Sequence, residues 1–330
     1  MPKTVVVSFC EEACMNSYVS GLVSVVIPSY KRADLLAKAI ETTLAQTYGH
    51  LELLVVDDNV KGDAYSRKLH EIIGSFKDKR LYLIEQEKHV NGAAARNAGI
   101  RAAKGEYIAF LDDDDYWEPQ KLERQVALLS ALDASWGAVS CMMRIYLQGR
   151  LICASLPYRD GAILLDLLTR KTSLGTGALL IRRTALDDSG YFDEALERHQ
   201  DLQLFARLAA KYKIKLLRTY LHNREYKDAQ NRPSPGQLQG IKTAYFRSIQ
   251  DILDTLKPSE LKKVYIMHDF ECAYVFFKNG LRKEGLAKLL GVFRTPTTLY
   301  LALERSVRRI VGMKGKFLLQ WKYGVGRAKW

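Results

Sequence analysis

Several features that define classes of protein are missing from this 330-residue chain. No run of apolar residues approaches the roughly 18 that a membrane-spanning helix needs. The five cysteines are odd in number and include no pair separated by two residues, which argues against a disulfide framework and against a zinc site. The apolar run at residues 4–9 is too short for a signal peptide, and two glutamates follow it. We therefore expect a cytoplasmic protein.

The charge of the chain is unevenly distributed. Residues 218–330 hold 22 Lys and Arg against 9 Asp and Glu, so this part accounts for the whole formal net charge of +13. Such a region fits an anionic partner, either a lipid headgroup layer or nucleic acid, and it equally fits a basic face that only contacts water. Charge alone does not choose among the three.

Residues 22–132 alternate between short apolar runs and segments with helical spacing, which is typical of βαβ units. The runs are poor in charge, as parallel strands covered on both faces should be. Strands are expected at 23–27, 51–56, 81–84 and 107–111, and helices at 35–44, 93–103 and 120–132. The fold class is therefore α/β, with a mostly parallel central sheet flanked by helices.

The rest of the chain reads as a completion of this domain followed by helices. A strand is expected over 142–153, a glycine-rich crossing at 174–181 and a helix over 199–212, and then helical stripes over 241–256, 261–276 and 283–293. Thr295-Pro296 predicts one more helix, amphipathic and basic, that suits either a membrane interface or docking on the body. The predicted division is an extension at 1–20, an α/β domain at 21–220, a flexible loop or lid at 221–240, and a basic helical region at 241–330.

Acidic residues follow two of the expected strands. Asp57-Asp58 ends the second strand, and the run Asp112-Asp113-Asp114-Asp115 ends the fourth. In open α/β sheets ligands bind beyond the carboxyl ends of the strands, so both sets should face one crevice. Four adjacent carboxylates repel one another, and a divalent cation, Mg²⁺ or Mn²⁺ holding a diphosphate, would neutralise them. The alternative is an exposed acidic turn that caps the next helix.

Five ordered motifs between residues 23 and 119 resemble those of family 2 glycosyltransferases. They are SVVIPSYKR at 24–32, LAQTY at 44–48, LVVDDN at 54–59, NGAAARNAG at 91–99 and GEYIAFLDDDD at 105–115. A weaker resemblance continues to about residue 217. The resemblance implies a GT-A fold and an inverting, metal-dependent hexosyltransferase that uses a nucleotide sugar, usually a UDP sugar, with Mn²⁺ or Mg²⁺.

The resemblance also implies roles for particular residues. It assigns the nucleoside and nucleotide contacts to Pro28, Tyr30, Asp58, Arg96 and Asn97, the ribose contact to Asp113, and the metal to Asp112 and Asp114. Four consecutive aspartates leave the register of this last match uncertain by one residue.

Inverting transfer needs a general base for the acceptor hydroxyl. In the family a Glu-Asp pair late in the domain supplies it, and here Gln200-Asp201 stands in that place, so Asp201 matches the base. An acid that stabilises the start of a helix is the other explanation of Asp201. His222, Arg224 and Arg232 are candidates for a lid over the diphosphate, or are simply solvated. The segment 175–177 resembles the acceptor-side strand, and a tight strand crossing would explain its glycines too.

Other classes fit less well. No G-x-G-x-x-G follows the first strand, as a dinucleotide dehydrogenase requires, and residues 28–32 lack the glycines of a sugar nucleotidyltransferase. We expect an enzyme of cell-surface polysaccharide synthesis that acts on a glycan or lipid-linked glycan. Its basic C-terminus would contact the cytoplasmic membrane face as a peripheral protein, with no nucleic-acid partner. The alternative is a non-catalytic module, binding nucleotide sugar, membrane or nucleic acid, on the same scaffold.

Overall fold

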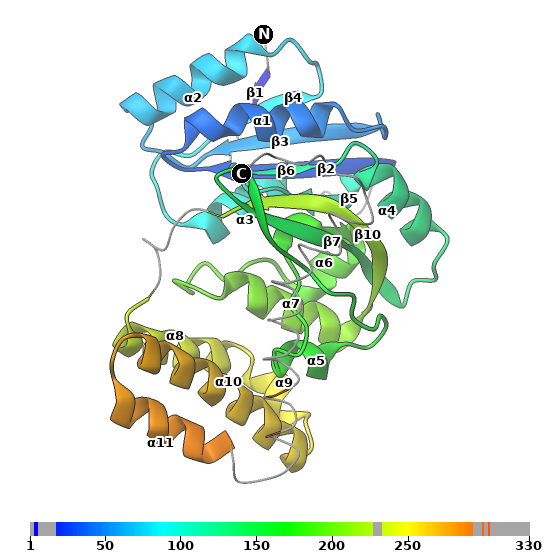
Figure 1. Ribbon diagram of the computed structural model, residues 1–330. Coiled ribbons are helices and arrows are strands. Elements are labelled where there is room, and N and C mark those ends of the chain that lie inside the picture. The colour runs from blue at the N-terminus through cyan, green and yellow to red at the C-terminus, as the bar shows by residue number, and fades with distance from the viewer. Residues whose placement is uncertain (1–2, 6–17, 227–232, 293–298, 300–302, 304–330) are drawn as a thin grey trace.

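The computed structural model describes residues 3–5, 18–226, 233–292, 299 and 303 (Figure 1). Cys10, Cys14, Arg232 and the helix expected after Thr295 lie outside the described residues, as does most of the expected extension at 1–20.

The described chain is built around one ten-stranded sheet with the order β1-β4-β3-β2-β5-β9-β7-β10-β6, and β8 pairs with β7. The strands are β1 (Lys3–Val5), β2 (Val19–Ser29), β3 (Leu51–Asp57), β4 (Leu81–Glu85), β5 (Gly105–Phe110), β6 (Asp115–Trp117), β7 (Trp136–Leu147), β8 (Arg150–Ala154), β9 (Leu179–Arg182) and β10 (Lys213–Glu225). The five neighbouring strands β1, β4, β3, β2 and β5 are all parallel to one another. All four strands expected from the apolar runs are present.

The sheet is mixed, because β9 lies antiparallel to both β5 and β7, and β6 lies antiparallel to β10. The expectation of a single strand over 142–153 is wrong. The chain turns at Gln148 and Gly149, both with positive φ of 50° and 73°, and returns as β8 in a hairpin. Glycine suits this turn because it adopts positive φ without steric cost.

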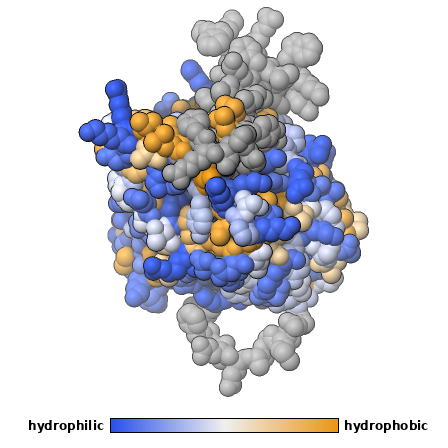
Figure 2. Space-filling model, turned by 90° about the horizontal axis from the view of Figure 1, so that it is seen from below, coloured by the Kyte–Doolittle hydropathy of each residue, from blue (hydrophilic) through white to orange (hydrophobic). Residues whose placement is uncertain are grey.

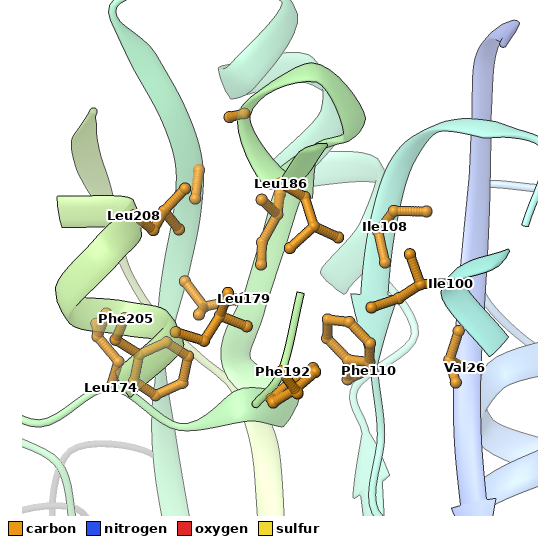
Figure 3. Packing of buried hydrophobic residues seen from close by; sticks show 14 of the residues in the cluster. Val26, Ile100, Ile108, Phe110, Leu174, Leu179, Leu186, Phe192, Phe205 and Leu208 are labelled. Atoms are coloured by element: carbon orange, nitrogen blue, oxygen red, sulfur yellow. The ribbon is translucent and has the colours of Figure 1, made fainter. Parts of the chain in front are cut away.

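Helices cover both faces of the sheet. They are α1 (Ala33–Leu44), α2 (Ala64–Ser75), α3 (Gly92–Ala102), α4 (Lys121–Ser130), α5 (Leu164–Leu168), α6 (Arg183–Ser189) and α7 (Gln200–Lys211). In β2, Val25 and Ile27 face a core shared with α1, α2 and α4, while Val26 faces a core shared with α3, α6 and α7. Figure 3 shows part of the second core, where Phe110 meets Phe192 edge to face with ring centroids 5.3 Å apart. This two-sided burial explains why the strands read as continuous apolar runs.

The C-terminal helices form a separate layer below the sheet (Figure 1). They are α8 (Pro235–Ser248), α9 (Gln250–Asp254), α10 (Pro258–Lys278) and α11 (Arg282–Val292). A small core that includes Leu168 of α5, Ala206 of α7 and Tyr245 of α8 joins them to the α/β part. The helical stripes expected after residue 240 are therefore confirmed. β10 extends to Glu225 and α8 begins at Pro235, so the connection is shorter than the expected loop at 221–240.

None of the described helices combines the length and apolar character that crossing a membrane requires.

Candidate active site

A pocket of about 330 Å³ lies between the segment after β5, strand β10 and the start of α7. Its wall includes Arg96, Asp112, Arg170, Asp201, His222 and Arg224. The expected metal ligand Asp112 and the expected base Asp201 therefore share one cavity, as do the three small residues 175–177. Pro28, Tyr30, Asp58, Asn97, Asp113 and Asp114 were also predicted as site residues and do not line this pocket.

Asp112 is held at the pocket wall by Arg96, whose Nη2 donates a hydrogen bond of 2.5 Å to Asp112 Oδ1. Burial pushes the pKa of Asp112 up, but the charge and hydrogen bond of Arg96, together with Arg224 and His222, push it further down, so the net pKa lies below the usual value. Asp112 is therefore ionised and has positively charged side chains around it. In such an arrangement the carboxylate can hold a cation while the arginines bind a diphosphate.

The other three aspartates of the run bond to other partners, and of these three only Asp115 also lines the pocket. The Ser29 hydroxyl donates to Asp113 Oδ2 at 2.9 Å, and burial, followed by the charge of Asp114, raises the pKa of Asp113 to about 7. Asp114 forms a 2.8 Å ion pair with Arg32. The structure thus brings Asp112 to the pocket but leaves its expected partner Asp114 outside it.

Asp115 is the first residue of β6 and forms a buried pair with His222 of β10, with Oδ2 and Nε2 2.9 Å apart. Burial raises the pKa of Asp115, although the His222 contact opposes this. A Cβ on Gly177 would lie 2.7 Å from His222 Nε2, so glycine is needed there to admit the imidazole. The glycine at 177 therefore reflects close packing against His222. Of the proposed lid residues, His222 and Arg224 line the pocket.

A second cluster of predicted residues forms where β2 and β3 end. Asp58 is buried, and His89 Nδ1 lies 2.9 Å from its Oδ2. The His89 ring also stacks on Tyr30, with centroids 3.7 Å apart and an interplanar angle of 12°. Burial raises the pKa of Asp58, with His89 opposing the shift. Pro28 lies beside this cluster in β2, opposite Val56 of β3.

His89 was missed by the motif comparison, because it lies just before the motif at 91–99 rather than within it.

The side-chain amide of Asn97 is used within the protein. Its Nδ2 donates to the Phe192 carbonyl and to Glu194 Oε1 at 2.9 and 2.7 Å, and its Oδ1 accepts from the Phe192 amide at 3.1 Å. These bonds satisfy the amide on both sides. We infer that Asn97 fixes the loop before α7, whereas its neighbour Arg96 faces the pocket.

Asp201 lies in the first turn of α7, where its Oδ1 accepts a 2.9 Å hydrogen bond from the Leu202 amide. The residue before this helix start, His199, has a left-handed backbone with φ of 64° and also lines the pocket. Burial, then the charges of Lys242 and Arg170, lower the pKa of His199 to about 3, so its imidazole is neutral. Sequence reasoning missed Arg170, because it belongs to none of the motifs.

Solved structures with the same arrangement identify the fold. The S. aureus TarS 1-349 crystal structure aligns with a TM-score of 0.60 and 16% identity, covering 93% of each chain. The mannosyltransferase PcManGT from Pyrobaculum calidifontis, in complex with GDP-Man and Mn²⁺, aligns with a TM-score of 0.56 and 16% identity, covering 92% of this chain and 88% of that one. At such identities the likeness shows the fold alone, and it confirms the GT-A expectation.

Residues 24–188 match the model of glycosyl transferase family 2, and the chain belongs to this family. It is 38% identical over 105 residues to the E. coli UDP-Glc:alpha-D-GlcNAc-diphosphoundecaprenol beta-1,3-glucosyltransferase WfaP, covering 32% of this chain and 40% of that protein. It is 35% identical over 193 residues to the uncharacterized glycosyltransferase RP339 of Rickettsia prowazekii, covering 56% and 58%. A second E. coli enzyme of the same description, WfgD, is 25% identical over 251 residues, covering 76% and 92%. The chain thus spans about half the length of the first two relatives.

Proposed function

We propose that this chain is an inverting glycosyltransferase that moves a sugar from a nucleotide sugar, a UDP sugar in our proposal, to a hydroxyl of a lipid-linked glycan in cell-surface polysaccharide synthesis. The observation on which this rests is the shared pocket, with Asp112 and Arg96 in one part and Asp201 in another. The descriptions of WfaP and WfgD support the choice of a UDP sugar and a diphosphate-linked acceptor.

A divalent cation fits this donor site only together with a diphosphate. The described residues contain no group of three or more His, Cys, Asp or Glu side chains arranged to hold a metal. Mg²⁺ is, however, commonly bound by one or two carboxylates with substrate phosphates completing its ligands. In this arrangement Asp112 would hold the cation, and Asp114 would have to leave Arg32 to join it. Bound there, Mn²⁺ or Mg²⁺ would neutralise charge on the departing diphosphate.

The residues of the chain perform the remaining steps. Arg96 and Arg224 place positive charge beside Asp112, where negative charge grows on the leaving group. The Leu202 amide holds the Asp201 carboxylate at the wall, and this carboxylate removes the proton of the acceptor hydroxyl as the hydroxyl attacks the anomeric carbon. Attack comes from the face opposite the diphosphate, which inverts the configuration.

The nucleoside would bind at Pro28, Tyr30 and Asp58, beyond the edge of this pocket. In the structure His89 occupies both the Tyr30 ring face and the Asp58 carboxylate. A base that stacks on this face of Tyr30 and bonds to Asp58 must therefore displace His89. A ribose hydroxyl would bond to Asp113 beside its contacts with Ser29 and Arg32.

We further propose that the protein contacts the cytoplasmic membrane face peripherally. Seven of the large apolar side chains that are exposed in the described chain belong to the C-terminal region. They are Tyr265, Tyr274 and Phe277 of α10, Leu286 and Leu290 of α11, and Leu281 and Leu303. Figure 2, which views the molecule from the side of these helices, shows apolar patches among hydrophilic ones. The basic character of residues 218–330 fits an anionic headgroup layer.

The activity is tested by calorimetric titration of UDP, GDP and dTDP with and without Mn²⁺, followed by transfer from UDP-glucose and UDP-GlcNAc to a GlcNAc-diphospholipid. Asp112→Asn should weaken Mn²⁺-dependent binding of UDP about tenfold or more, because it removes the anion that holds the cation. Asp201→Asn should bind UDP normally and lose transfer by about a hundred- to ten-thousandfold. Asp188→Asn, on the surface beside Lys211, is the matched control and should change neither.

Two results would contradict the proposal. Failure of the wild-type protein to bind any of the diphosphates would favour the non-catalytic module, and retained transfer in Asp201→Asn would show that another group is the base.

A further inference from the structure

Arg170 is a pocket residue with no role in the scheme above. It follows α5, and its backbone is left-handed with φ of 56°, a conformation that is uncommon for a residue with a side chain. Its side chain is only 19% exposed. The surrounding structure therefore holds a guanidinium at the pocket wall against a local backbone preference.

The guanidinium is poorly satisfied by the protein. Arg170 Nη2 lies 3.8 Å from Glu271 Oε1, which is too long for a hydrogen bond. Glu271 is shared, because Lys242 Nζ donates to its other oxygen at 2.6 Å. Arg170 Nε is buried and has no hydrogen-bond partner among the described residues. Buried donors of a charged group are costly to leave unpaired, so the described protein uses only part of the hydrogen-bonding capacity of Arg170, and the part of its side chain that lines the pocket can bind a ligand.

The charge around Arg170 also favours an anion. Two cations, Arg170 and the buried Lys242, face the single carboxylate of Glu271. The neutral His199 beside them adds no compensating negative charge, and the positive charges of Lys242 and Arg170 help to keep its pKa low. Two cations therefore share one carboxylate next to Arg170, and Asp201 is the other acidic group on this side of the pocket.

The pocket thus has two cationic groups with different neighbours. Arg96 and Arg224 accompany Asp112, where the donor diphosphate is placed, while Arg170 lies on the same wall as the start of α7 and Asp201. We propose that Arg170 binds a phosphate group of the acceptor, which fixes the acceptor hydroxyl beside Asp201. Ser173, which also lines the pocket, offers a hydroxyl to the same group. This assignment rests on the proposed function and specifies its acceptor as a phosphate-linked lipid.

The test measures binding to the full chain saturated with UDP and Mg²⁺, so that the donor site is filled. Geranyl phosphate, geraniol and inorganic phosphate are titrated into the wild-type protein and into Arg170→Gln, Arg170→Lys and Glu271→Gln. Wild-type protein should bind geranyl phosphate about tenfold or more tightly than geraniol, as expected for charged hydrogen bonds to a phosphate. Arg170→Gln should lose this preference, and Arg170→Lys should recover part of it.

Glu271→Gln separates ligand binding from structure. If Arg170 only ties α5 to α10, loss of its ion-pair partner should abolish the preference as fully as Arg170→Gln does, and this result would overturn the proposal. Retained preference in Glu271→Gln supports it.

The remaining outcomes are also decisive. Equal binding of geranyl phosphate and geraniol overturns the proposal, and so does inorganic phosphate binding as tightly as geranyl phosphate, since the site would then hold a free anion. Weaker UDP binding in Arg170→Gln would assign the residue to the donor and overturn the acceptor role. Absence of UDP binding in the wild-type protein would instead count against the proposed function itself.

Discussion

Lys121 is a charged residue that the fold buries completely. Its side chain is fully buried, its Nζ has no hydrogen-bond partner in the described part of the chain, and it lies over the Trp117 ring with Nζ 3.8 Å from the centroid. Trp117 in turn donates its indole N–H to the Gly177 carbonyl at the pocket wall. We predict that replacing the ammonium, by Lys121→Met, stabilises the protein at neutral pH.

The magnitude follows from the titration of the amine. Burial lowers the pKa of Lys121 from 10.5 to about 8, which makes the charged form cost about 3 kcal/mol. The Trp117 ring offsets about 1 to 2 kcal/mol of this through its interaction with the cation. The thiol of the nearby Cys141 does not help, because burial raises its pKa to about 11 and it stays neutral. Lys121→Met should therefore gain about 1 to 2 kcal/mol at pH 7.

The gain should depend on pH with a definite sign. The unfolded chain keeps the proton up to about pH 10.5, whereas the folded chain releases it at a lower pH, about 8 before the ring contact is counted. Protonation therefore favours unfolding, and the cost is fully present below pH 8 and fades as the pH rises toward 10.5. Urea unfolding at pH 7 and at pH 10, with the exposed Lys211→Met as the control, should show a clearly smaller gain at pH 10 than at pH 7. Destabilisation of Lys121→Met at pH 7 would refute the reasoning, since the ring contact would then outweigh desolvation.

Two further predictions concern packing and surface. A Cβ at Gly99 would lie 2.3 Å from Val26 Cγ1 in the core, so Gly99→Ala should lower stability by about 1 to 3 kcal/mol, measured by thermal unfolding. Gly49→Ala, where a Cβ meets nothing within 4 Å, is the control, and an unchanged melting temperature in Gly99→Ala would show that α3 can shift. Wild-type protein should co-sediment with anionic vesicles, and added salt should weaken this binding. The double variant Leu286→Asp, Leu290→Asp should bind these vesicles less, because both leucines are exposed. Equal co-sedimentation of the wild-type protein with neutral vesicles would exclude an electrostatic contribution to membrane binding.

The sequence predicted the strands whose own residues reveal them, because the apolar pattern of each is visible without knowledge of its partners. Parallel strands buried on both faces read as apolar runs, and all four expected runs became β2, β3, β4 and β5. In such sheets ligands bind beyond the carboxyl ends of the strands. Asp58 and Asp112 do follow the ends of β3 and β5, as expected. The antiparallel β9 and the β7–β8 hairpin were missed, because pairing direction depends on partners that are distant in the chain.

Adjacent residues in the acidic run show why side-chain roles were harder to predict. Asp112 turns to Arg96, Asp113 to Ser29, Asp114 to Arg32 and Asp115 to His222. Each partner comes from a different element, so no spacing within the run reveals it. A motif match therefore located the site but did not distinguish Asp112 and Asp115, which line the pocket, from Asp113 and Asp114, which do not.

The largest revision concerns the C-terminal region, which the sequence presented as a basic appendage. Lys242 of α8 and Glu271 of α10 form a partly buried ion pair next to Arg170, and Tyr245 of α8 packs against His199 with ring centroids 5.7 Å apart. These contacts set the charge and packing immediately before Asp201. The helical region therefore supports two residues of the pocket wall, Arg170 and His199. Substitutions in α8 or α10 should affect acceptor binding more than UDP binding.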